Sequence, residues 1–181
     1  MLSQELLDRI RFRAEDARTR TDLLNNVGAG STLIARATLE QIKTAENELG
    51  FPLPRDLVDL YLKIANGGFG PGCGIIGLSN GWTDDQGATL VSLYLDCLER
   101  RKQSDPDWRW PQRLLPFCYL GCASYSCIDC NSESARVVAA DSEVDGWPEE
   151  CSSLREWITA WAAGEDMGER YRVVVSPYYP D

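Results

Sequence analysis

Four of the seven cysteines in this chain lie close together, in the stretch CYLGCASYSCIDC at residues 118–130. Such thiols can bind a metal, form disulfides, act as nucleophiles or pack as small apolar side chains. Their spacing is C-x3-C-x4-C-x2-C, whereas zinc ribbons use two C-x2-C pairs separated by a longer stretch. Bacterial ferredoxin spacing does not fit either. We therefore expect these cysteines to pack in the core and to hold no metal, with a metal or redox role as the alternative.

The same stretch alternates along the chain as β-strands do. A hairpin that turns near residues 121–124 would bring Cys118 and Cys127 opposite each other. This pair would permit an incidental disulfide on oxidation. A structural disulfide is disfavoured in a reducing cytoplasm, where thiols stay reduced.

Histidine is absent from the sequence. A Ser–His–Asp triad and a Cys–His nucleophile pair therefore cannot be built from this chain. The glycines at 72, 74 and 77 match the pattern G-x-G-x-x-G, but they follow a predicted helix and enter a predicted strand, which is the reverse of a dinucleotide site. We expect no catalytic residues and no cofactor.

The formal net charge is −10. Nucleic acids bind clustered Lys and Arg, so this charge disfavours a nucleic-acid partner and favours a basic protein partner. The first twenty residues carry charges in every turn, which is not the pattern of a signal peptide. Because no apolar run approaches the roughly 20 residues that span a bilayer, we predict a cytoplasmic protein without membrane contact.

Tryptophans lie beside aspartates in two segments that have the composition of loops. Aromatic side chains inside an acidic rim are what a basic partner protein would contact. The alternative is that the tryptophans fold back over the sheet as part of the core. The predicted partner-binding residues are Trp82, Asp84, Asp85, Asp105, Asp107, Trp108 and Trp110.

Hydrophobic periodicity and capping signals predict the elements that position these residues. Apolar residues at helical spacing predict helices over 2–18, 38–50, 54–66, 88–101 and 153–164. In the second of these, Thr38 and Gln41 form a capping box, Leu39, Ile42, Ala45 and Leu49 form the apolar stripe, and Gly50 ends the helix. Short apolar runs predict strands over 75–78, 114–121, 124–130, 135–141 and 171–175.

Helices that are separate in sequence from a run of neighbouring strands predict a single α+β domain. We expect a mainly antiparallel twisted sheet with helices packed against it. Residues 1–37 are predicted to form an N-terminal helix and a linker that belong to the same unit as residues 38–181.

The stretch ELGFPLPRDLVDLYLKIANGG (48–68) resembles the SUKH superfamily, which includes bacterial immunity proteins and the fungal cell-wall-assembly regulator. LLPF (114–117), YSCIDC (125–130), VVAAD (137–141) and the helix SLREWITAW then follow in the order of that family. The matching residues of the first block are Glu46, Leu49, Gly50, Leu53, Pro54, Asp56, Leu57, Tyr61, Asn66, Gly67 and Gly68.

The resemblance implies a SUKH-like α+β domain over residues 38–181 without known catalysis. Bacterial members typically neutralise toxins, often nucleases, by direct binding. We therefore expect a cytoplasmic immunity protein whose partner is a basic toxin. The alternative is a regulatory scaffold that binds endogenous partners, as in the fungal members.

Overall fold

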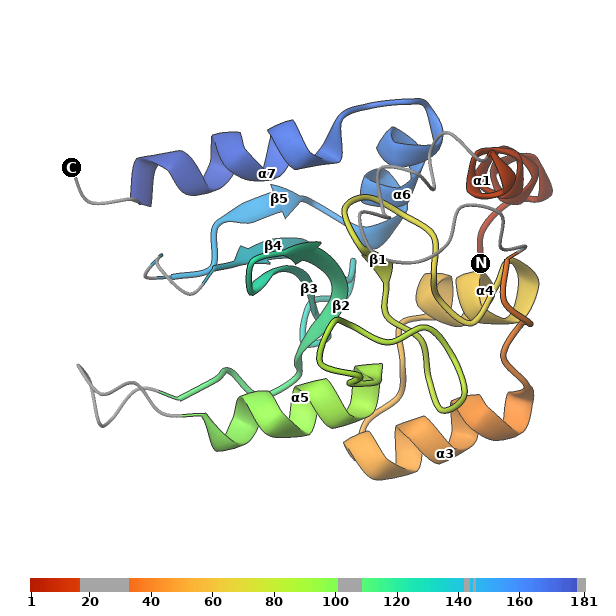
Figure 1. Cartoon of the computed structure of the whole chain (residues 1–181), viewed down its shortest axis with the longest axis horizontal. Coiled ribbons are helices and arrows are strands. Elements are labelled where there is room, and N and C mark those ends of the chain that lie inside the picture. Colours follow the sequence, from red (N-terminus) through yellow and green to blue (C-terminus); the bar gives the residue numbers. More distant parts are fainter. Residues whose placement is uncertain (17–32, 101–108, 142–143, 145, 179–181) are drawn as a thin grey trace.

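The chain folds around one five-stranded sheet (Figure 1). The structure is a computed structural model, and it describes residues 1–16, 33–100, 109–141, 144 and 146–178. The strands follow the order β1–β2–β3–β4–β5 across the sheet, and each neighbouring pair is antiparallel. The predicted α+β class with a mainly antiparallel sheet is therefore confirmed.

Along the described part of the chain, three helices come first, followed by one strand, one helix, four consecutive strands and two helices. The strands are β1 (Gly74–Ile75), β2 (Leu114–Gly121), β3 (Ser124–Asp129), β4 (Val137–Ala140) and β5 (Glu149–Cys151). The helices are α1 (Gln4–Glu15), α3 (Leu39–Leu49), α4 (Arg55–Lys63), α5 (Leu90–Glu99), α6 (Leu154–Ala162) and α7 (Met167–Val175), and a 3-10 turn follows at Ser176–Tyr178. None of the described helices is both long enough and apolar enough to cross a membrane.

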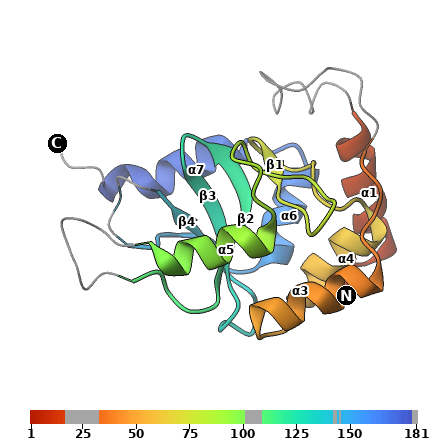
Figure 2. The same cartoon turned by 60° about the horizontal axis from the view of Figure 1, so that its bottom comes forward.

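The helices cover both sides of the sheet. In Figure 1, α6 and α7 lie along one side and α5 along the other, while α1, α3 and α4 gather beyond the β1 edge. Figure 2 shows α5 crossing in front of strands β2 to β4. Because both faces are covered, the strands are buried along most of their length rather than on alternate residues.

The second predicted helix is confirmed at both ends. Thr38 Oγ1 accepts a hydrogen bond from the Gln41 amide (3.2 Å), and Gln41 Oε1 accepts one from the Thr38 amide (2.8 Å). Gly50 follows the helix with φ at +77°. One member of the predicted apolar stripe is wrong, because Leu39 is 64% exposed at the start of the helix, where its side chain lies outside the core.

The predicted strand at 171–175 is wrong, since these residues belong to helix α7. The Asp166 carboxylate caps the helix by accepting a hydrogen bond from the Glu169 amide (2.9 Å). Met167, Tyr171 and Val175 are buried at the i, i+4, i+8 spacing of one helical face. Packing of this face against the sheet outweighs the strand preference of the valine run.

The predicted strand at 75–78 is shorter than expected. Gly74 and Ile75 form the ladder pairs with β2, and the Ile76 amide still donates to the Phe117 carbonyl (2.8 Å). The chain turns away at Gly77, whose amide donates to the Trp82 carbonyl (2.6 Å). Strand β5 was not predicted, since its residues Glu149–Cys151 have the composition of an acidic turn.

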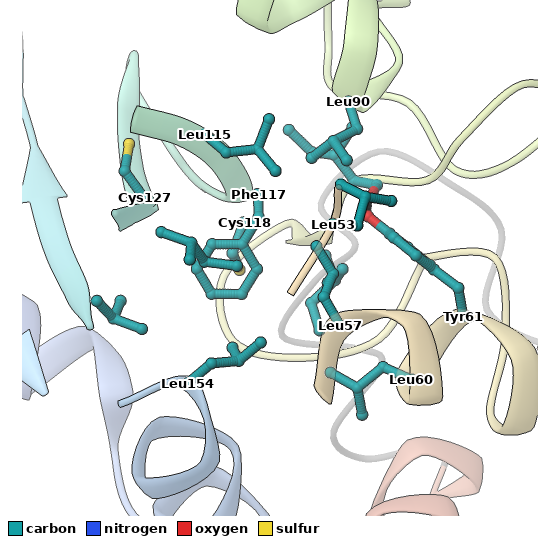
Figure 3. Close-up of a cluster of buried hydrophobic side chains, with 14 of the residues drawn as sticks. Leu53, Leu57, Leu60, Tyr61, Leu90, Leu115, Phe117, Cys118, Cys127 and Leu154 are labelled. Atoms are coloured by element: carbon teal, nitrogen blue, oxygen red, sulfur yellow. Dashed lines mark hydrogen bonds between the residues drawn. The ribbon is translucent and has the colours of Figure 1, made fainter. Parts of the chain in front are cut away.

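The core joins the helices beyond the β1 edge to the centre of the sheet (Figure 3). The rings of Phe117 on β2 and Trp157 on α6 pack edge to face with centroids 4.9 Å apart. Tyr61 on α4 is fully buried, and its hydroxyl donates to the Ile76 carbonyl (2.6 Å), so its polar end is satisfied.

Helix α1 is attached to the same core. Its residues Leu7, Ile10 and Ala14 are buried. At its start, the buried Asp59 carboxylate accepts a hydrogen bond from the Leu2 amide (2.7 Å) and pairs with Lys63 (2.6 Å). The first residues of the chain are therefore fixed to α4.

We expect the replacement Gly67→Ala to destabilise the fold more than Gly87→Ala. Both glycines have similar left-handed φ values, +85° and +81°. A Cβ at position 67 would lie 2.6 Å from the Ile75 carbonyl oxygen, whereas nothing lies within 4 Å of a Cβ at position 87. Gly87→Ala should lower the free energy of unfolding by about 1–2 kcal/mol, and Gly67→Ala by at least about 2 kcal/mol more.

Urea denaturation of the two variants measures this difference. Equal losses would show that the close backbone approach at Gly67 is not a constraint.

Candidate partner-binding surface

Asn66 fixes the loop that carries Trp82. The Asn66 side chain accepts a hydrogen bond from the Leu78 amide (2.8 Å) and donates to the Ser79 carbonyl (3.2 Å), while its own carbonyl accepts from the Trp82 amide (2.9 Å). Gly77 and Gly81 permit this approach, because a Cβ on either would lie within 2.6 Å of the Asn66 carbonyl oxygen. The segment from Gly77 to Trp82 is thus held against the end of α4.

Trp82 lies half-buried on this loop. Its indole N–H donates to the Cys73 carbonyl (3.0 Å), and its ring packs against Gly68, where a Cβ would lie 3.1 Å from the ring. The ring therefore has a fixed orientation with part of its surface in contact with solvent.

The two aspartates that follow have different surroundings. Asp84 is nearly buried, at 9% exposure, and its Oδ1 accepts hydrogen bonds from the amides of Gln86 (3.0 Å) and Ala88 (2.8 Å), so it shapes the turn before α5. Asp85 is exposed, and its Oδ2 accepts a hydrogen bond from the Tyr119 hydroxyl (2.8 Å). Of the two, Asp85 offers its charge to solvent.

Tyr119 connects Asp85 to the sheet. Its ring lies 5.1 Å from the ring of Tyr125 on the neighbouring strand. Burial, followed by the hydrogen bond and the charge of Asp85, raises the pKa of the Tyr119 hydroxyl, so it stays a donor at neutral pH. The carboxylate is therefore oriented by a side chain of the rigid sheet.

Trp82 and Asp85 lie close to the same residue. Burial and then the Asp85 carboxylate raise the pKa of the Cys73 thiol, and the Cys73 carbonyl is the acceptor of the Trp82 indole. The structure thus brings together one aromatic and one acidic residue of the predicted set.

Trp110 precedes β2 and is buried, at 7% exposure. Its indole N–H donates to the Leu114 carbonyl (2.7 Å), and its ring packs edge to face with Trp147 at 4.8 Å between centroids. For this residue the structure has the alternative arrangement, in which the ring belongs to the core. The predicted residues Asp105, Asp107 and Trp108 lie outside the described residues.

Helix α5 follows the loop that carries Trp82 and Asp85. Leu90, Leu93 and Cys97 face the core. The opposite face exposes Leu95, Asp96 and Glu99, and the exposed Arg100 follows them at the C-cap of the helix. Ten helical residues extend over about 15 Å. The apolar stripe in the sequence implied this acidic face, but the predicted set did not include it.

We call Trp82, Asp85, Leu95, Asp96 and Glu99 the α5 surface. It combines a fixed aromatic ring, a fixed carboxylate and two further carboxylates on a helix packed against the sheet. Each carboxylate can pair with a cationic side chain, and the ring can contact one through its face.

The cysteines of the opening stretch are free thiols, as are the other cysteines of the chain. The predicted hairpin forms, but its register differs from the expected one, because a bulge after Pro116 places Cys118 opposite Ser126 and Cys127 opposite Pro116. Both thiols are completely buried among apolar side chains (Figure 3), and this burial raises the pKa of each well above its usual value. Over the described part of the chain, no group of three or more Cys, Asp or Glu side chains is placed to hold a metal ion.

A comparison with protein families matches residues 36–160 to the SMI1 / KNR4 family (SUKH-1). The match includes the α5 surface and the whole sheet, and it leaves α1 and α7 outside. No curated protein matches the chain in a sequence search.

We expect Tyr119 and Asp85 to be coupled energetically. A double-mutant cycle with Tyr119→Phe, Asp85→Asn and the double variant, measured by chemical denaturation, should give a coupling energy of about 0.5–1.5 kcal/mol. The reason is that the hydroxyl donates to a charged oxygen at the edge of the core. A coupling energy of zero would mean that the sheet does not hold the Asp85 carboxylate.

Proposed function

The chain belongs to the SMI1 / KNR4 family (SUKH-1), and on this premise we propose that it is a cytoplasmic, non-catalytic immunity protein that neutralises a basic toxin by binding it directly. Family membership supports an immunity-type or a regulator-type protein. The observation that carries the finer proposal is the acidic α5 surface in a chain with a net charge of −10.

Charge on this surface suits the capture of a cationic partner. Asp85, Asp96 and Glu99 are exposed, and among the described residues of the surface and the α5 C-cap the one basic side chain is Arg100, which follows Glu99. Complementary charge speeds association and selects against acidic partners. A nuclease that binds nucleic acid presents a positive surface of the kind that would be attracted here.

The α5 surface is also ordered before any partner binds. The Trp82 ring is held by the Cys73 carbonyl and Gly68, and the Asp85 carboxylate is held by Tyr119. Ordering side chains on binding costs free energy, so groups fixed in advance contribute more to affinity. A half-exposed tryptophan is also a common anchor in protein interfaces.

The thiols support a non-catalytic role. A nucleophilic cysteine needs a thiolate, which forms where a positive environment lowers the pKa. Burial instead raises the pKa of Cys118, Cys127 and Cys97. These thiols are therefore better suited to packing in the core than to nucleophilic catalysis.

We expect removal of charge from the α5 surface to weaken toxin binding. The triple variant Asp85→Asn, Asp96→Asn, Glu99→Gln should bind the proposed basic toxin about 10- to 100-fold more weakly than the wild type, mainly through slower association and with a smaller salt dependence. Stopped-flow or surface-based kinetics at two salt concentrations measures both effects.

The matched control is Glu5→Gln, Glu133→Gln, Glu169→Gln, which removes three exposed carboxylates from other parts of the surface. Its affinity for the toxin should stay within about threefold of the wild-type affinity. Equal losses in both variants would contradict the α5 surface as the binding site. Failure of the wild type to bind that toxin or protect against it, together with recovery of housekeeping proteins in pull-downs, would favour a regulatory scaffold.

A further inference from the structure

Glu150 is a carboxyl group placed inside the protein by a β-bulge. Val137 pairs with Cys151 and Val138 pairs with Glu149, so Glu150 is an extra residue on the edge strand β5. A bulge bends the strand and redirects a side chain. Glu149 is exposed as expected, whereas Glu150 is only 6% exposed.

The Glu150 carboxyl is only half satisfied by its neighbours. Its Oε2 accepts hydrogen bonds from the Ser126 hydroxyl (3.1 Å) and the Trp157 indole (3.2 Å). Its Oε1 is buried and has no hydrogen-bond partner among the described residues. An ionised carboxylate in this position would have an oxygen without a donor, which is costly in the protein interior.

The groups around Glu150 stabilise a negative charge less than burial destabilises it. The cation among them is Arg170, which pairs with Glu165 and Glu156 and donates to the backbone carbonyl of Glu150 (3.3 Å). The titratable and charged groups that face this region come from β2, β3, β5, α6 and α7, and they are Cys118, Cys127, Cys151, Glu156, Arg170 and Tyr171.

Burial raises the pKa of the Glu150 carboxyl to about 7, although the hydrogen bonds from Ser126 and Trp157 and the charge of Arg170 oppose this rise. In an opened, hydrated state the group would ionise near its ordinary value of 4.5. The closed state therefore binds the proton more tightly than the opened state. Its relative stability is greatest at low pH and declines as the pH rises from about 4.5 to about 7.

The edge of the sheet next to Glu150 is formed by a short strand with few pairs. Strand β5 pairs with β4 at only two positions, while β2 and β3 share a long central ladder. Helix α7 adds a hydrogen bond from Arg170 to the Cys151 sulfur (2.9 Å) and one from the Tyr171 hydroxyl to the Ala140 carbonyl (2.8 Å). Water can reach Glu150 if this edge moves while the centre of the sheet stays intact.

We propose that Glu150 acts as a proton-dependent latch, whose protonated form holds β5 and α7 on the sheet and whose ionised form favours opening of this edge. The latch lies on the opposite side of the sheet from α5, and it does not depend on the proposed toxin binding (Figure 1).

Hydrogen exchange of the full chain, followed by peptide mass spectrometry at pH 5 and pH 8, tests the latch. Glu150→Gln keeps an acceptor for Ser126 and Trp157 but cannot ionise, and comparison at equal pH cancels the intrinsic pH dependence of exchange. From pH 5 to pH 8, the exchange rate of wild type relative to Glu150→Gln should rise more than about tenfold in β5 and α7. The ratio for β2 and β3 should stay constant.

Glu149→Gln, which removes the neighbouring exposed carboxylate, should behave as the wild type does. A ratio that does not change with pH would overturn the proposal. An equal rise in β2 and β3 would also overturn it, because the whole domain would then be opening. If Glu150→Gln does not fold, the proposal can be tested by carbon NMR titration of Glu150 in the wild type. A pKa near the ordinary value of 4.5 would contradict the latch.

Discussion

The close approach of the Asn66–Gly68 turn to residues 75–82 is the constraint on which the functional surface depends. Asn66 makes three hydrogen bonds to this segment, and Gly67, Gly77 and Gly81 have no room for a Cβ. The Gly77 carbonyl then accepts the amide of Leu90, the first residue of α5 (2.9 Å). One turn thus connects the end of α4, strand β1, the Trp82 loop and the start of α5. The Asn-Gly-Gly motif does more than end a helix, because it sets the backbone that carries the α5 surface.

In this arrangement, the buried residues that hold the fold together are different from the exposed residues that are available to a partner. Buried side chains such as Tyr61, Phe117 and Trp157 join the helices to the sheet, and changes there would alter the fold. Asp96 and Glu99 project from a helix whose other face is in the core, so they can change without loss of packing. Such a combination, with a rigid support below and replaceable side chains above, suits the proposed binding of a partner.

The sequence predicted well where local chemistry decides the structure. The capping box of Thr38 and Gln41 and the apolar stripe of α5 depend on residues within a few positions of each other. Prediction failed where distant contacts decide. The valines of α7 favour a strand, but burial of Met167, Tyr171 and Val175 on one side favours a helix. The burial of Glu150 depends on a bulge that no local pattern indicates. The hairpin was expected, but its bulge moved Cys118 away from Cys127. Trp110 and Trp82 have similar sequence surroundings, and only the fold distinguishes the buried ring from the half-exposed one.

The central claim is that the α5 surface contacts the partner. The most direct measurement is the hydrogen-exchange footprint of the chain in complex with its toxin, read against the free protein. Our account predicts slower exchange in the loop at 79–88 and in α5, with α1 and α7 unchanged. A footprint on α1 or α7 that leaves α5 unchanged would contradict it.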